Sequence, residues 1–337
     1  MSSPQKIPAL VEGSELTLRP DDRLVDAAYR VLRRHFVRMV WNESGTREGT
    51  DPARLHDMRV ATRRLRAALG VFQSALGASR VKPLREPLRR IGRTLGAVRD
   101  LDVQLARLGA DARSGPSLSR GHARDALGES IGLYRAFLEA RRNEARLAML
   151  RELSDGRRLD FMKRFRRFLD AGAPKRPSAG GRRAAAEEGA RIVRKRLKKA
   201  LEGGRNLTRR STDAELHAQR IRLKRLRYAC EFFADLLGPE GVKFTTRVVE
   251  LQDALGDQHD AVVGRETLSG IARGLRAPAR LRRRVFLMLG HLAAQAARRE
   301  RAARETFAKL WKRFDRKRTR RALATALKSC LDCPPTK

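Results

Sequence analysis

The chain has 337 residues, 41% of them hydrophobic and only 5% aromatic, so its core must be built largely from Leu, Ala and Val. Its 76 Lys and Arg residues outnumber its 38 Asp and Glu residues, and the resulting net charge of +38 favours a polyanionic partner such as nucleic acid, an anionic membrane surface or polyphosphate. No segment resembles a signal peptide or a membrane span, which predicts a cytoplasmic protein.

The order of elements along the chain predicts an all-α fold. Residues 1–20 are expected to be a flexible lead-in. From Asp21 onward apolar residues recur at helical spacing, beginning with Leu24, Val31 and Phe36. The period-two alternation of a half-buried strand is not sustained. Breakers rich in glycine and proline separate the helical segments, which are therefore expected to be joined as antiparallel hairpins.

A linker is predicted at residues 172–185. This stretch is rich in Gly, Pro, Ser and Arg and lacks apolar periodicity. It divides the chain into a first helical bundle at 21–171 and a second at 186–325, and residues 326–337 follow as a C-terminal tail.

Two sequence motifs occur once in each half, in the same order. HDMRVATRRLRAAL at 56–69 is echoed by HAQRIRLKRLRYAC at 217–230, and the first positions give an offset of 217 − 56 = 161. TLGAVRDLDV at 94–103 is echoed by ALGDQHDAVV at 254–263, where Asp100 and Asp260 give an offset of 260 − 100 = 160. Two ordered matches at nearly equal offsets indicate a tandem duplication of two bundles of about four helices each.

The first motif of each half places its cations along one side of a helix. At about 100° per residue, Arg59, Arg63 and Arg66 share a stripe with His56, largely opposite the apolar residues. A solvated face of an amphipathic helix is one interpretation. However, the stripe carries no glutamate, so its cations repel one another unless an anion is bound. The stripe recurs at His217, Arg220, Lys224 and Arg227, while Arg64 and Arg225 flank the other sides of the two helices.

The second motif extends this candidate site. Arg99 and His259 take equivalent places, and each is followed by an aspartate. Asp100 and Asp260 are predicted to orient neighbouring Arg or His side chains. A carboxylate beside many arginines is expected to stay ionised, which makes it a poor general acid.

At these residues the sequence resembles the CHAD family, the conserved histidine α-helical domain. The resemblance rests on HDMRVATRRLRAAL, LGAVRDLD, HAQRIRLKRLRYACEFF and LQDALGDQHDAVV, and it covers residues 21–325. It implies two four-helix bundles with pseudo-twofold symmetry, a basic cavity between them, and binding of inorganic polyphosphate. Some members associate with polyphosphate or polyhydroxyalkanoate granules. By motif, the implied binding residues are His56, Arg59, Arg63, Arg64, Arg66, Arg99, His217, Arg220, Lys224, Arg225, Arg227 and His259.

The leading prediction is a non-catalytic polyphosphate-binding protein without cofactor or metal, and granule association is a compatible further role. A nucleic-acid-binding protein is the alternative, but the stripes lack aromatic residues for base stacking, so nucleic acid is expected to bind only non-specifically. An enzyme is not expected, because no phosphate-binding loop, acidic metal cluster or activated nucleophile is evident. The C-x-x-C pair of Cys330 and Cys333 lacks the second half of a zinc site.

Overall fold

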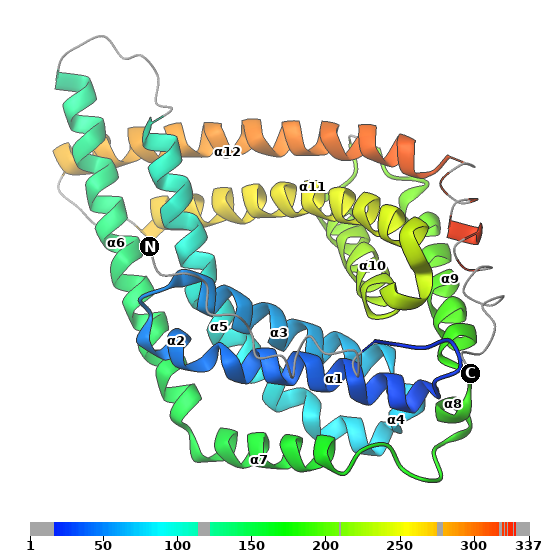
Figure 1. Ribbon diagram of the computed structural model, residues 1–337. Helices are drawn as coiled ribbons and strands as arrows, with labels where there is room; N and C mark the ends of the chain where they lie inside the picture. Colours follow the sequence, from blue (N-terminus) through cyan, green and yellow to red (C-terminus); the bar gives the residue numbers. More distant parts are fainter. Residues whose placement is uncertain are drawn as a thin grey trace.

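The computed structural model describes residues 17–113, 122–208, 210–274 and 279–316, together with 319, 321, 323–325 and 327. Its regular elements are all helices, apart from one isolated bridge between Arg23 and Ala184 (Figure 1). The predicted all-α fold is confirmed. Cys330, Cys333 and most of the predicted N-terminal lead-in lie outside the described residues.

Two sets of helices follow one another along the described chain. The first set comprises α1 (Leu24–Trp41), α2 (Glu43–Glu48), α3 (Pro52–Val71), α4 (Gln73–Leu76), α5 (Ala78–Arg113), α6 (His122–Ser154), α7 (Gly156–Asp170) and α8 (Ala179–Arg182). The second set comprises α9 (Ala185–Gly204), α10 (Asp213–Phe232), α11 (Ala234–Gly274) and α12 (Ala279–Phe314).

The two helices that carry the basic motifs begin at clear capping signals. The Asp51 side chain accepts a hydrogen bond of 2.8 Å from the backbone N–H of Ala53, at the start of α3. Thr212 and Glu215 form a complete capping box at the start of α10. Both arrangements satisfy backbone N–H groups that lack a partner inside the helix. The caps therefore fix where each basic stripe begins.

Helix positions repeat with the offset found in the sequence. The starts of α1 and α9 differ by 185 − 24 = 161, and the starts of α3 and α10 differ by 213 − 52 = 161. Gly77 and Gly238 are separated by the same offset, and both have positive φ, which glycine adopts without steric cost. Gly238 lies at a kink in α11, just as Gly77 separates α4 from α5. These matches support the tandem duplication, while the pseudo-twofold symmetry and the proposed domain limits stay predictions.

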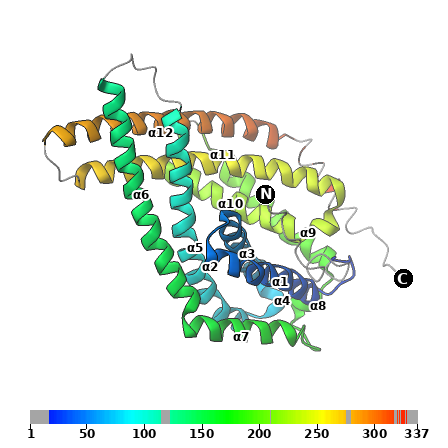
Figure 2. The same cartoon turned by 60° about the vertical axis from the view of Figure 1, so that its left-hand side comes forward.

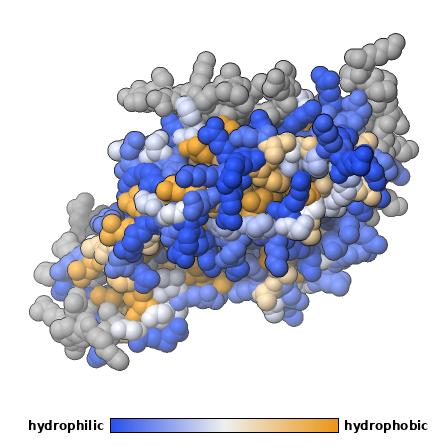
Figure 3. All heavy atoms as spheres, turned by 90° about the horizontal axis from the view of Figure 1, so that it is seen from below, coloured by the Kyte–Doolittle hydropathy of each residue, from blue (hydrophilic) through white to orange (hydrophobic). Residues whose placement is uncertain are grey.

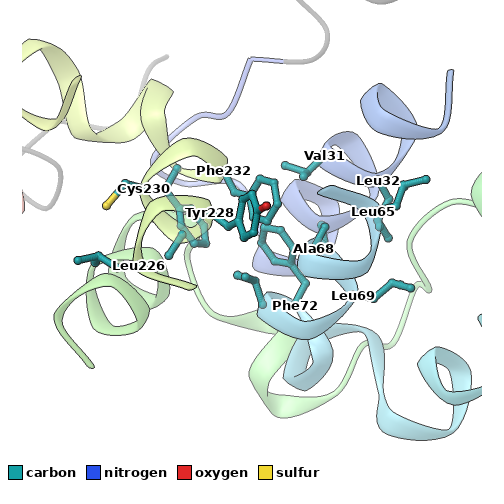
Figure 4. Close-up of a cluster of buried hydrophobic side chains, with 14 of the residues drawn as sticks. Val31, Leu32, Leu65, Ala68, Leu69, Phe72, Leu226, Tyr228, Cys230 and Phe232 are labelled. Atoms are coloured by element: carbon teal, nitrogen blue, oxygen red, sulfur yellow. The ribbon is translucent and has the colours of Figure 1, made fainter. Parts of the chain in front are cut away.

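One hydrophobic core includes residues of both halves. The Phe72 ring, after α3, lies 5.5 Å from the Phe233 ring and 6.1 Å from the Phe232 ring, measured between centroids. Figure 4 shows Phe72 and Phe232 together in this core. Phe72 and Phe233 stand at equivalent positions of the repeat, since 233 − 72 = 161. Their contact holds α3 beside α10, so the two basic motifs lie close together.

The predicted linker at 172–185 is ordered and attached to the first half. It contains the one-turn helix α8, and the Ser178 hydroxyl donates a hydrogen bond of 2.8 Å to the Ser74 carbonyl. The backbone N–H of Leu24 donates to the Arg183 carbonyl at 2.8 Å. Gly and Pro in this segment thus mark turns between anchored residues, not a free spacer.

A smaller hydrophobic cluster joins the long helices far from the main core. It brings α5 and α6 into contact with α11 and α12 through Leu108, Leu138, Leu268, Met288, Leu289 and Leu292. Figure 2 shows α6 running across the ends of α11 and α12. Together the two hydrophobic clusters hold α3 and α5 opposite α10 and α11, and the polar residues described below lie between these helices.

Candidate functional site

A cleft of about 600 Å³ lies between the two halves. Its walls come from α3 and α5 of the first half and from α10 and α11 of the second, with further residues from α6 and α12. Leu108, Leu268 and Leu292 of the smaller hydrophobic cluster form part of its lining. The predicted site residues that line it are His56, Arg59, Arg63, Arg99, Asp100, Arg220, Lys224, His259 and Asp260.

The cations of the two halves lie close enough to share one electrostatic field. Burial lowers the pKa of Arg220, and Arg63 and Arg59 of the opposite half lower it further. Lys224 responds most: burial, followed by Arg220, Arg63 and Arg59, lowers its pKa from 10.5 to about 8. The Nε atoms of Arg63 and Arg220 are buried without a hydrogen-bond partner. The cleft therefore concentrates positive charge from both halves.

Two carboxylates of the cleft are paired with arginines. Asp100 lies 3.4 Å from Arg59, and Asp260 lies 2.8 Å from Arg107, a cleft residue that the motif analysis missed. Arg107 follows Arg99 on α5 and could have been found by extending the stripe along the helix. Partial desolvation raises the pKa of Asp100, and the Asp260 carboxylate adds to this rise. Arg59, at 3.4 Å, opposes this rise, and the expectation that Asp100 stays ionised and orients an arginine remains a prediction.

The three motif histidines take different places around the cleft. The His217 and His259 rings lie 5.0 Å apart, with His259 in the lining. Burial and Arg220 lower the pKa of His259, while burial and Arg99 lower that of His56. These two rings are thus predominantly neutral at neutral pH and offer a hydrogen bond more readily than a charge.

A second basic cavity, of about 1260 Å³, shares Arg63 and Lys224 with the cleft. We call it the α9 groove, because α9 supplies several of its cations. Of the predicted residues, Arg66 and Arg225 line this groove and do not line the cleft. Its other cations were not predicted, namely Arg85, Arg89, Arg191, Lys195, Arg196 and Lys199.

The predicted cations differ in whether they form an ion pair with a carboxylate. Arg64 contacts Glu231 at 3.1 Å and Arg227 contacts Glu231 at 2.6 Å, and neither arginine lines the cleft or the α9 groove. Within the described part of the chain, Arg63 and Lys224 form no such pair. Cations without a carboxylate partner therefore meet where the two cavities join.

Neither a metal-ligand cluster nor a membrane span is found within the described residues. Their His, Cys, Asp and Glu side chains nowhere gather in a group of three or more suited to a metal ion. None of the described helices is both long enough and apolar enough to cross a membrane.

Comparison with known proteins matches the chain to one family. The family model described as CHAD domain matches residues 30–269. Two uncharacterized proteins of Mycobacterium tuberculosis, MT2285 and Rv2226, are each 31% identical over 235 residues, which cover 68% of this chain. The aligned region is only 42% of those relatives, so the chain spans less than half their length.

Two solved structures have a similar fold. The crystal structure of the CHAD domain from the plant Ricinus communis matches with a TM-score of 0.67 and 28% identity, covering 91% of this chain and 96% of that one. PptA from Streptomyces chartreusis matches with a TM-score of 0.66 and 22% identity, covering 85% of this chain and 98% of that one. At this lower identity, the second match shows the fold alone.

Proposed function

Because this chain belongs to the CHAD domain family, we propose that it is a non-catalytic protein that binds inorganic polyphosphate between its two halves. The observation that carries the proposal is the position of Arg63 and Lys224. They come from opposite halves, and both line the cleft and the α9 groove. A linear polyanion in the cleft can therefore continue past them into the groove.

Polyphosphate suits this lining because every unit of the chain carries negative oxygens at a regular spacing. Arginine donates two parallel hydrogen bonds to such oxygens, and lysine provides a compact charge. Counterions released from the polyanion add to the affinity and make it fall steeply with salt. The repulsion among Arg59, Arg63, Arg220 and Lys224 in the free protein is relieved when the anion binds.

A binding role also suits the acids of the cleft. Asp100 faces Arg59, and Asp260 faces Arg107, so each carboxylate helps to hold a guanidinium in place. Phosphoryl transfer characteristically requires bound metal ions to neutralise the developing charge. We therefore assign Asp100 and Asp260 positioning roles rather than roles in metal-assisted hydrolysis.

Nucleic acid is the second candidate, and one residue favours it. Tyr134 lines the cleft, where its ring offers a stacking surface to a base of a single strand. Polyphosphate remains the better fit, since Tyr228, the aromatic residue of the first motif in the second half, lines the α9 groove but is largely buried. Much of the surface seen in Figure 3 is hydrophilic and its apolar residues form separate patches. We therefore propose that the protein associates with granules through bound polyphosphate and not through an apolar surface.

Calorimetric titration tests the proposal directly. The protein is titrated with long-chain polyphosphate, double-stranded DNA and single-stranded RNA at two salt concentrations and matched phosphate concentration. We expect polyphosphate to bind more tightly than either nucleic acid at physiological ionic strength. Equal or tighter binding of DNA or RNA would contradict the proposal.

A further inference from the structure

Glu231 connects a cation of each half. Its carboxylate lies 3.1 Å from Nη2 of Arg64 on α3 and 2.6 Å from Nε of Arg227 on α10. All three side chains are largely buried, with exposed fractions between 19% and 25%. Arg227 donates a charge-assisted hydrogen bond to Oε1 of Glu231, whereas Arg64 lies within ion-pair distance of Oε2 without forming a hydrogen bond.

Glu231 is also the one acid in the lining of a separate pocket of about 400 Å³, which we call the Glu231 pocket. Three arginines line this pocket, and the His35 ring is buried among them with its Nδ1 atom lacking a hydrogen-bond partner. Burial, followed by Arg64, Arg38 and Arg34, lowers the pKa of His35 to about 3. The three arginines thus add to the effect of burial on His35, and Glu231 is the single acid that faces them in this pocket.

The Glu231 pocket is the repeat counterpart of the α9 groove. Adding the repeat offset of 161 to the positions of its lining from the first half gives positions that line the groove. Val31, Arg34, His35, Arg38 and Arg64 correspond in this way to Ile192, Lys195, Arg196, Lys199 and Arg225. The duplication has therefore produced two equivalent basic cavities on different sides of the α3 and α10 pair.

The two cavities differ at several equivalent positions, among them His35 against Arg196 and Thr246 against Arg85, and the groove has acids of its own, Glu86 and Glu188, which pair with Arg89 and Arg191. The acid of the Glu231 pocket has no acidic counterpart in the groove. Gly70 occupies in the α9 groove the place that Glu231 occupies in its own pocket, since 231 − 70 = 161. The groove residues Arg66 and Arg225 are the counterparts of Arg227 and Arg64. Across the described residues, neither Arg66 nor Arg225 forms an ion pair. One pair of arginines holds a carboxylate, and its counterpart faces solvent.

We infer that Glu231 is a specificity-determining residue, a built-in anion that closes one of two equivalent cavities and confines the phosphate chain to the other. This inference rests on the proposed function. Glu231 neutralises the charges of Arg64 and Arg227 from within the protein, so these two arginines attract phosphate less than their counterparts do. Gly70 brings no charge, and Arg66 and Arg225 stay available.

Transferring the charge to the open cavity tests the inference. Gly70→Glu places a carboxylate in the α9 groove, and Gly70→Gln adds similar bulk without charge. A Cβ atom at Gly70 meets no atom within 4 Å, so neither substitution creates a clash at Cβ. We expect Gly70→Glu to weaken binding of long polyphosphate on the order of tenfold more than Gly70→Gln does, because like charges placed together are unfavourable. Equal losses in the two variants would overturn the inference.

Removing the charge from the closed cavity tests it a second time. Glu231→Gln keeps the shape of the side chain, and pyrophosphate is a probe small enough for the pocket. We expect this variant to bind one more pyrophosphate than the wild type, and the double variant with Arg64→Ala to lose that additional ion. A Glu231→Gln protein with native helicity and unchanged stoichiometry would overturn the inference. Failure of the wild type to bind long polyphosphate would instead overturn the proposed function. In that case, the pyrophosphate stoichiometries of Glu231→Gln and wild type would still show whether Glu231 excludes an anion from its pocket.

Discussion

Arg63 and Lys224 stand at equivalent positions of the repeat, on α3 and α10, and both line the cleft and the α9 groove. The contact of Phe72 with Phe233 lies on the same pair of helices and holds them side by side. Burial of these aromatic rings therefore stabilises a helix pair that would otherwise be driven apart by its own charges.

Lys224 should make polyphosphate binding dependent on pH. In the free protein its pKa is about 8, and a bound anion is expected to raise that pKa again. Binding then takes up a proton, and affinity falls as the pH rises above about 8. Titrations in buffers of different ionisation enthalpy measure this uptake. Lys224→Arg should flatten the profile, since arginine stays charged, and an equally steep profile in that variant would contradict the assignment.

The same lysine should destabilise the free protein at neutral pH. Its pKa in the folded chain lies below its ordinary value of 10.5, so the unfolded chain binds more protons between about 8 and 10.5. The free energy of unfolding therefore rises with pH across that window. Below the window, the destabilisation caused by the buried charge of Lys224 is fully present. After allowance for solvent screening, Lys224→Met should stabilise the protein by about 1 kcal/mol at neutral pH. Thermal unfolding measures the change, with the exposed Lys163→Met on α7 as a control, and a lower Tm for Lys224→Met would contradict it.

Phe72 should be critical for stability. Its ring is fully buried between the halves, whereas Phe286 is 44% exposed. Truncation of a buried phenylalanine to alanine costs about 3–5 kcal/mol, because apolar contacts are lost and a cavity remains. Phe286→Ala is expected to cost less than about 1 kcal/mol. Denaturant unfolding compares the two variants, and similar losses would show that the contact between the halves contributes little.

Polyphosphate should remain intact when mixed with the protein and magnesium. This expectation follows from the assignment of Asp100 and Asp260 as partners of Arg59 and Arg107. An assay for released orthophosphate makes the measurement. Release that disappears in the Asp260→Ala variant would identify a catalytic carboxylate and overturn the non-catalytic proposal.

The sequence predicted the helices and much of the cleft because both follow from local periodicity and from the repeat. Arg59, Arg63, Arg220 and Lys224 lie on their predicted stripe, and α3 and α10 meet in space. The cations of α9 were missed because that helix repeats α1 and lies outside the two motifs. Its residue Arg196 comes beside Arg225 only through the packing of α9 on α10.

Glu231 shows why long-range partners were harder to find. Its contact with Arg227 spans one helical turn and could have been predicted from the i,i+4 spacing. Its contact with Arg64 joins residues from opposite halves of the chain. Only the packing of α3 against α10 creates that contact, so no helical wheel could separate Arg64 from the arginines of the cleft.

The most direct test of the central claim is the stoichiometry and affinity of polyphosphate binding when each half is altered in turn. Arg59→Ala with Arg63→Ala removes cations from the first half, and Arg220→Ala with Lys224→Ala removes their counterparts. Lys163→Ala with Arg166→Ala, on the exposed face of α7, is the matched control. If both halves hold the same chain, wild type binds one chain per protein, and each pair of changes weakens it about a hundredfold or more, since a charged hydrogen bond contributes about 1.5–3 kcal/mol. Two independent chains on the wild type, with each double variant losing only one, would contradict a shared site.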